Sequence, residues 1–154
     1  MGSGWLGTRP KYIEWLQLFP QQQRRCVTKL RIKGNSLRLR VTRSEVSTLI
    51  DAGRVEETIC FSAGDQMRLT YALVCDSAVA SAQVRYTGSE IAVILPRDQA
   101  MTWAGSDQVG IYAAVDLGLQ GGLDIVVEKD FACLDHSDAE NIDTFPNPNA
   151  GAAC

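Results

Sequence analysis

Residues 27–41 read VTKLRIKGNSLRLRV, with charged and apolar residues alternating strictly on both sides of Gly34-Asn35. Alternation around such a dipeptide predicts a β-hairpin with a two-residue turn. A three-residue loop would mix polar and apolar side chains on each face, so the period of two itself selects the shorter turn. In the resulting register Arg31 pairs with Arg38.

This register places five cations on one face of the hairpin. Like charges that face each other across two strands destabilise a sheet. The face therefore needs water, acidic side chains of the same chain such as Glu128, or a bound anion, and these three explanations stay open. The candidate anion-binding residues are Lys29, Arg31, Lys33, Arg38 and Arg40.

The composition indicates one soluble domain. The chain has 154 residues, of which 45% are hydrophobic and 21% charged, enough to bury a core. Its longest apolar run is far shorter than the roughly 20 residues that span a bilayer, so no membrane partner is expected. The five cysteines are widely scattered and predict free thiols, which points to the cytoplasm.

Charge is unevenly distributed along the chain. Residues 1–68 hold 12 Lys and Arg against 6 Asp and Glu, whereas residues 69–154 hold 3 against 12. Two halves that neutralise each other within one fold are the simpler interpretation. A pI near 5.1 makes nucleic acid a less favoured partner.

Three segments differ in character. Residues 1–26 are interpreted as an N-terminal extension or a mis-assigned start, because the alternating pattern begins at Val27. Residues 27–134 are expected to form a single β-rich domain. Residues 135–154 form an acidic tail that is either disordered or anchored by Phe145.

The pattern predicts an α+β fold. Thr42 and Glu45 form a capping box at the start of a helix that reaches about Ala52, and Pro96 opens a second short helix to about Ala104. With the hairpin, about eight strands are expected, mostly antiparallel, in a sandwich or partly open barrel. The further strands are expected at 54–61, 67–75, 79–86, 91–95, 109–115 and 123–128.

Catalytic and metal signals are weak. Cys133 and His136 have a spacing that suits two ligands of one metal, but His136 is the single histidine and a structural zinc site needs four ligands. A buried Cys133 and an exposed His136 are the simpler interpretation. The neighbouring acids would raise the pKa of this thiol and so disfavour a reactive thiolate. No catalytic residue and no cofactor is predicted.

Two resemblances follow from these motifs. The segments KLRIKGNSLRLR (29–40) and EKDFACL (128–134), with Phe145-Pro-Asn-Pro148, resemble a small bacterial family of unknown function over roughly residues 27–150. The family implies no activity. The cationic strand is also loosely similar to triphosphate tunnel enzymes, β-barrels whose inward Arg, Lys and Glu hold a triphosphate and its metal. Their Glu-x-Glu-x-Lys strand has no acidic counterpart here, so Glu57 and Glu128 would have to be the metal ligands.

The sequence thus favours a binding protein over an enzyme. Its cationic hairpin face would take a phosphorylated small molecule or an acidic protein segment. One alternative is a metal-dependent triphosphate or phosphate-ester hydrolase of the tunnel type. Another is a protein-interaction module in which residues 128–150 cover the basic face until a partner displaces them.

Overall fold

The computed structural model describes residues 28–63, 67–133 and 141–150. The expected extension at residues 1–26, His136 and much of the acidic tail lie outside these ranges. The expected domain boundaries fall beside or within the undescribed segments and stay predictions.

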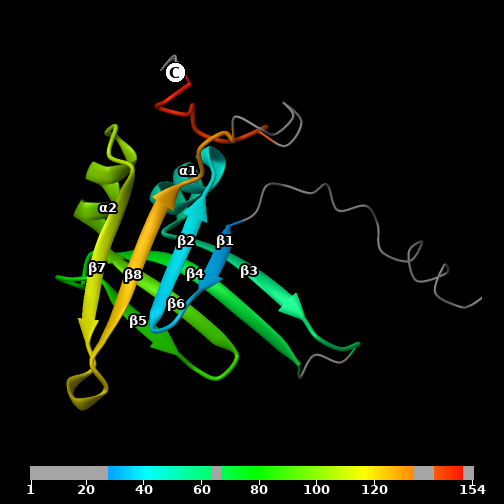
Figure 1. Ribbon diagram of the computed structural model, residues 1–154, viewed down its shortest axis with the longest axis vertical. Coiled ribbons are helices and arrows are strands. Elements are labelled where there is room, and N and C mark those ends of the chain that lie inside the picture. Colours follow the sequence, from blue (N-terminus) through cyan, green and yellow to red (C-terminus); the bar gives the residue numbers. More distant parts are fainter. Residues whose placement is uncertain (1–27, 64–66, 134–140, 151–154) are drawn as a thin grey trace, which may run out of the picture.

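In these ranges, eight strands form two four-stranded sheets that pack face to face (Figure 1). Both sheets are mixed, and their buried faces enclose one hydrophobic core. Sheet A has the order β1 (Lys29–Ile32), β2 (Ser36–Val41), β8 (Gly122–Lys129), β7 (Gly110–Asp116). Sheet B has the order β3 (Arg54–Cys60), β4 (Arg68–Asp76), β6 (Glu90–Pro96), β5 (Gln83–Tyr86).

The first hairpin has the predicted register. Lys29 lies opposite Arg40, and Arg31 opposite Arg38. Gly34 has a φ of 55°, in the left-handed region that favours glycine, which explains why the tight turn falls here. The cations therefore alternate with the apolar residues that β2 turns into the core.

Two helices cover one end of the sandwich (Figure 1). In α1 (Arg43–Ala52) the predicted capping box is complete, because Thr42 and Glu45 bond each other's free backbone N–H groups. α2 (Arg97–Ala104) follows β6 directly, with Pro96 as its N-cap residue. Leu49 of α1 and Trp103 of α2 are fully buried and close the core at this end. None of the helices in the described part of the chain has the length and apolar character to cross a bilayer.

The predicted α+β sandwich, mostly antiparallel, is confirmed. Four of the six strand pairings are antiparallel. The two central pairings, β2 with β8 and β4 with β6, are parallel, and neither sheet closes into a barrel. Hairpin signals reveal only neighbouring strands, so the parallel pairs between distant hairpins had no local signal.

The chain contains one structural unit twice. The order β1-β2-α1-β3-β4 repeats as β5-β6-α2-β7-β8, and each unit gives one hairpin to each sheet. The edge hairpin, the central parallel pair and the helix after the second strand all recur in the same places. Some of the matching residues are identical and lie 54 positions apart, among them Arg31 and Arg85, Gly34 and Gly88, and Arg43 and Arg97.

Candidate functional site

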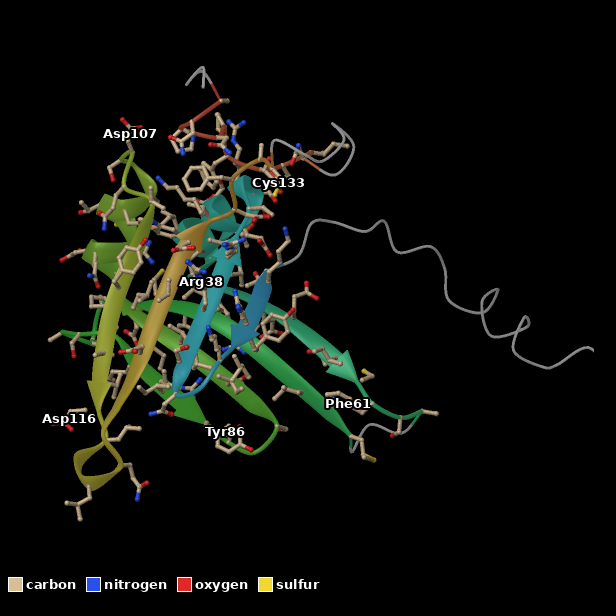
Figure 2. The ribbon with its side chains drawn as sticks, in the orientation of Figure 1. Arg38, Phe61, Tyr86, Asp107, Asp116 and Cys133 are labelled. Atoms are coloured by element: carbon tan, nitrogen blue, oxygen red, sulfur yellow. The ribbon has the colours of Figure 1, made fainter. Side chains whose placement is uncertain are left out.

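The outer face of sheet A carries the predicted cations. Leu37, Leu39 and Val41 of β2 are buried in the core, so the side chains between them point away from sheet B. Arg38 therefore lies on the outer face near the middle of the sheet (Figure 2). The hairpin register brings Arg31 beside it. We call this surface, with Lys29, Arg31, Lys33, Arg38 and Arg40, the cationic face.

Glu128 of β8 neutralises the centre of the cationic face. The parallel pairing of β2 and β8 places it beside Arg40, and only 8% of the residue is exposed. Arg38 Nη2 lies 2.9 Å from Glu128 Oε1, and Arg40 Nε lies 3.6 Å from Oε2. The Tyr112 hydroxyl also donates to Oε1 at 3.2 Å. Burial and the Glu128 charge together raise the pKa of Tyr112.

A glycine makes room for this arrangement. A Cβ on Gly110 of β7 would lie 2.8 Å from the carbonyl oxygen of Val127 and 2.9 Å from Glu128 Cγ. Real side chains do not tolerate such distances, and the Val127 oxygen belongs to the backbone and cannot swing away. Gly110 thus lets the Glu128 side chain lie flat on the sheet.

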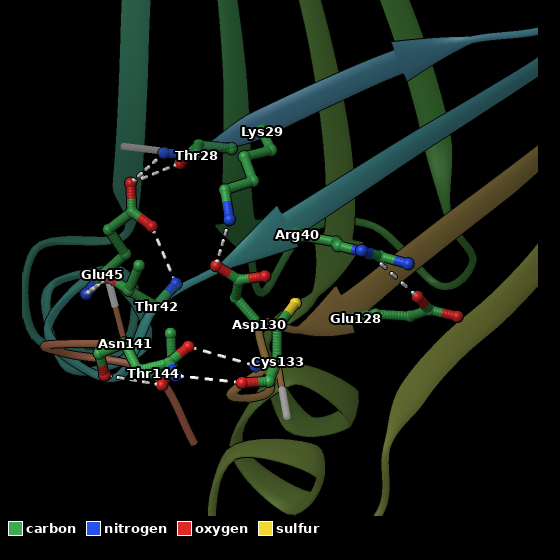
Figure 3. Close-up of polar contacts among 10 residues, drawn as sticks. All are labelled: Thr28, Lys29, Arg40, Thr42, Glu45, Glu128, Asp130, Cys133, Asn141 and Thr144. Carbon is green, nitrogen blue, oxygen red and sulfur yellow. Dashed lines mark hydrogen bonds and ion pairs between the residues drawn. The ribbon is translucent and has the colours of Figure 1, made fainter. Parts of the chain in front are cut away.

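A second carboxylate reaches the edge of the face. Asp130 follows β8 and is only 3% exposed, and its Oδ2 lies 2.7 Å from Lys29 Nζ (Figure 3). Within the described part of the chain, no carboxylate pairs with Arg31 or Lys33. Glu128 and Asp130 are thus ion-paired with three of the five cations, whereas Arg31 and Lys33 have no carboxylate partner in this part of the chain. Asp124 shares the outer face of β8 with Glu128 but makes none of these ion pairs.

A small hollow lies between the strands of the hairpin. It measures about 120 Å³ and is lined by Lys29, Leu30, Arg31, Arg38 and Arg40. Arg38 Nε is buried and has no hydrogen-bond partner among the residues that the structure describes. Buried donors are normally satisfied, because an unpaired one costs about 1–3 kcal/mol. The hollow thus combines four cations with an unsatisfied donor.

The two carboxylates of the hydrolase alternative do not meet. Glu57 shares the face of β3 that carries the buried Val55, which turns toward sheet A. Glu128 lies on the opposite, outer side of sheet A. Burial and the neighbouring Glu45 carboxylate raise the pKa of Glu57. Glu57 and Glu128 therefore lie on different sheets and on faces that point in different directions, and this placement does not favour them as joint ligands of one metal.

Cys133 is an exposed free thiol, against the expectation of a buried one. It lies beyond the end of β8, where the Asn141 amide bonds its backbone N–H and C=O at 3.0 Å each. These hydrogen bonds hold only the backbone of Cys133, and its side chain is exposed to solvent. The expected partner His136 lies outside the described residues. Among the residues the structure describes, no three Asp, Glu, Cys or His side chains are grouped to hold a metal.

No hydrogen bond or ion pair joins the described tail residues, 141–150, to the five cations of the cationic face. Phe145 packs against the core, and its backbone N–H donates to the backbone carbonyl of Asp130 at 2.8 Å. Asp143 accepts hydrogen bonds from the backbone N–H and the hydroxyl of Ser44 in the first turn of α1. The other tail acids, Asp135, Asp138 and Glu140, lie outside the described ranges. In the structure, Phe145 therefore anchors residues 141–150 of the tail to the core, as one of the two expectations for the tail proposed.

Sequence reasoning found the five cations and named Glu128 as a neutralising candidate. It missed Asp130, Gly110 and Tyr112 as members of the site. Asp130 follows β8, which pairs with β2, and Gly110 and Tyr112 belong to β7, which pairs with β8. No local pattern could therefore connect them with the hairpin. Only the pairing of β2 with β8, which are distant in sequence, could have linked these three residues to the hairpin.

These features define a class of structure: a two-sheet α+β sandwich with a doubled ββαββ unit and a cationic outer sheet face. Within that class, the chain belongs to DUF7009, a family of unknown function whose family model matches residues 28–149. No curated protein and no solved structure matches the chain. The resemblance carried by the hairpin and the EKDFACL segment is thus confirmed at the level of the family, which brings no activity with it.

Proposed function

We propose that the cationic face of sheet A binds a phosphate group of an anionic ligand. The single observation that carries the proposal is the buried, unpartnered Nε of Arg38 beside a hollow lined by four cations. A phosphate oxygen that reached this donor from the hollow would satisfy it, and guanidinium groups suit phosphate through charge-assisted, often bidentate bonds.

The internal repeat supports a functional origin for the charges. In the equivalent hairpin of sheet B, β5–β6, the positions that match Arg38 and Arg40 hold Ala92 and Ile94. The equivalent hairpin therefore forms without cations at these two strand positions. Because clustered like charges destabilise a sheet, their presence on β2 calls for a compensating benefit, which anion binding supplies.

The dimensions favour one phosphate group over a whole nucleotide. About 120 Å³ is well below the roughly 300–1,000 Å³ of pockets that enclose a complete small ligand. A nucleoside or sugar would stay outside the hollow, against the exposed Arg31 and Lys33. The ligand class is thus a phosphate ester or a polyphosphate whose terminal group enters the site.

The test is a binding titration of the full chain with tripolyphosphate at low and moderate salt. The variant Arg31→Gln/Lys33→Gln removes two cations that carry no ion pair among the described residues, and binding should weaken by about tenfold at low salt. Arg68→Gln is the matched control, because Arg68 is an exposed arginine of sheet B. Unchanged affinity in the double variant, or an equal loss in Arg68→Gln, would refute the proposal.

Glu128→Gln gives a second, independent readout. The carboxylate competes with an external anion for Arg38 and Arg40, so its neutralisation should tighten tripolyphosphate binding several-fold. The folded protein should at the same time lose about 1–2 kcal/mol of stability, because two guanidinium groups lose their partner. An acidic peptide is titrated in parallel, and tighter binding of that peptide than of tripolyphosphate would assign the face to a protein segment instead.

A further inference from the structure

Lys129 is a buried cation with no carboxylate partner among the described residues. It lies at the end of β8 on the core side of sheet A and is only 5% exposed. Its Nζ donates to the backbone carbonyl of Ser106 and lies 5.3 Å from the ring centroid of Phe145 and 5.8 Å from that of Trp103. A carbonyl and two aromatic faces thus surround the ammonium group, which has three donors and uses one.

A hollow of about 590 Å³ opens beside Lys129, at the end of the sandwich where the tail packs. This volume lies within the range of pockets that hold small molecules. Its walls are largely apolar, with Val109, Phe131, Phe145 and two prolines of the tail among the lining residues. The hollow is separate from the cationic face, because Lys129 projects to the opposite side of sheet A from Glu128.

The surroundings of Lys129 lack the counter-charge that buried cations normally have. Buried charges are usually paired, because desolvation of an unpaired ion is costly. Burial lowers the pKa of Lys129, while the more distant Asp107 carboxylate acts in the opposite direction. Asp107 lines the same hollow but makes no ion pair with Lys129. An anionic group inside the hollow would supply the missing partner.

We propose that this hollow binds a small aromatic carboxylic acid, with the carboxylate on Lys129 Nζ and the ring against the apolar wall formed with Phe145. One ammonium group balances the single charge of a carboxylate. A phosphate group carries about −1.5 to −2 at neutral pH and would leave part of its charge buried without a partner. The largely apolar walls match a flat ring.

The experiment compares 2-naphthoate with its neutral analogue 2-naphthamide by calorimetric titration of the full-length protein. Saturable binding of the acid, at least tenfold tighter than that of the amide, is expected. Lys129→Met replaces the ammonium with an apolar side chain of similar length, and the preference for the acid should disappear. In the hairpin variant Arg31→Gln/Lys33→Gln, naphthoate binding should stay unchanged.

The outcomes separate this site from the cationic face. The proposal is overturned if naphthoate does not bind saturably, if acid and amide bind equally, or if Lys129→Met keeps the preference. Loss of naphthoate binding in the hairpin variant alone would overturn it too, by placing the acid on the cationic face. Should Lys129→Met fail to fold, the comparison of acid with amide on the unaltered protein still decides.

Discussion

Gly110 determines how Glu128 lies on the outer face of sheet A. Its missing side chain leaves the space in which the Glu128 stem lies flat beside Tyr112, and from there the carboxylate reaches both Arg38 and Arg40. A glycine inside a strand normally weakens the sheet. Here that loss is offset by the partly buried ion pairs that the glycine permits.

Gly110→Ala should therefore destabilise the protein, although alanine is usually the better strand residue. The new Cβ would clash with the Val127 carbonyl and with Glu128, and overpacking of this kind costs about 1–3 kcal/mol. Urea unfolding measures the change. Gly122→Ala in β8 is the matched control, because its Cβ would meet only the Val115 oxygen at 3.9 Å. Equal stability of the two variants would show that Gly110 is not required by packing.

Among the secondary-structure elements, those formed by interactions between residues close in sequence could be predicted from local sequence patterns. The hairpin register follows from alternation around Gly34-Asn35, and the start of α1 follows from the Thr42 and Glu45 capping box. The Glu45 carboxylate also accepts hydrogen bonds from the backbone and hydroxyl of Thr28, which join the start of β1 to α1 (Figure 3). This link crosses 17 residues of sequence, so the capping pattern alone could not reveal it.

The tail is joined to α1 in the same way. Burial alone would raise the pKa of Asp143, but hydrogen bonds with Ser44 and Thr42 outweigh it and lower the pKa below its ordinary value. A carboxylate at a helix N-terminus also interacts favourably with the helix dipole. Asp143 thus fastens the returning tail to the first turn of α1.

Asp143→Asn should reduce stability at neutral pH by about 1 kcal/mol. Because the folded-state pKa is lowered, the contribution is present above about pH 4, the ordinary range of an Asp, and is lost as the pH falls through the folded-state value. Thermal unfolding at pH 7 and pH 3 should show a difference from the unaltered protein that shrinks in acid.

Asp51→Asn is the control for this prediction. It removes the same charge from the exposed C-terminal end of α1, where the helix dipole disfavours a carboxylate, so stability at pH 7 should be unchanged or slightly higher. A stability difference between Asp143→Asn and the unaltered protein that does not depend on pH would contradict the role given to the Asp143 charge.

In the whole molecule, the internal repeat explains the topology of the two sheets. The repeat itself could not be recognised from the sequence. The matching residues 54 positions apart are seldom identical and often differ in character, so the repeat emerges only when strand pairings are compared. The parallel pairs β2–β8 and β4–β6 each join one unit to the other. Neither unit can therefore complete a sheet without its counterpart.

This interlocking predicts how the chain behaves when divided between β4 and β5. Fragments 1–80 and 81–154 would each expose the inner edge of two central strands and the apolar faces that the other fragment covers. Each alone should lack a cooperative thermal transition, whereas an equimolar mixture should regain one transition and the near-UV circular dichroism of the buried Trp103. A fragment that folds cooperatively as a monomer would show that one ββαββ unit is self-sufficient. The fold would then be two docked domains, and the cationic face, which needs β2 from one unit and Glu128 from the other, would be an interface between them.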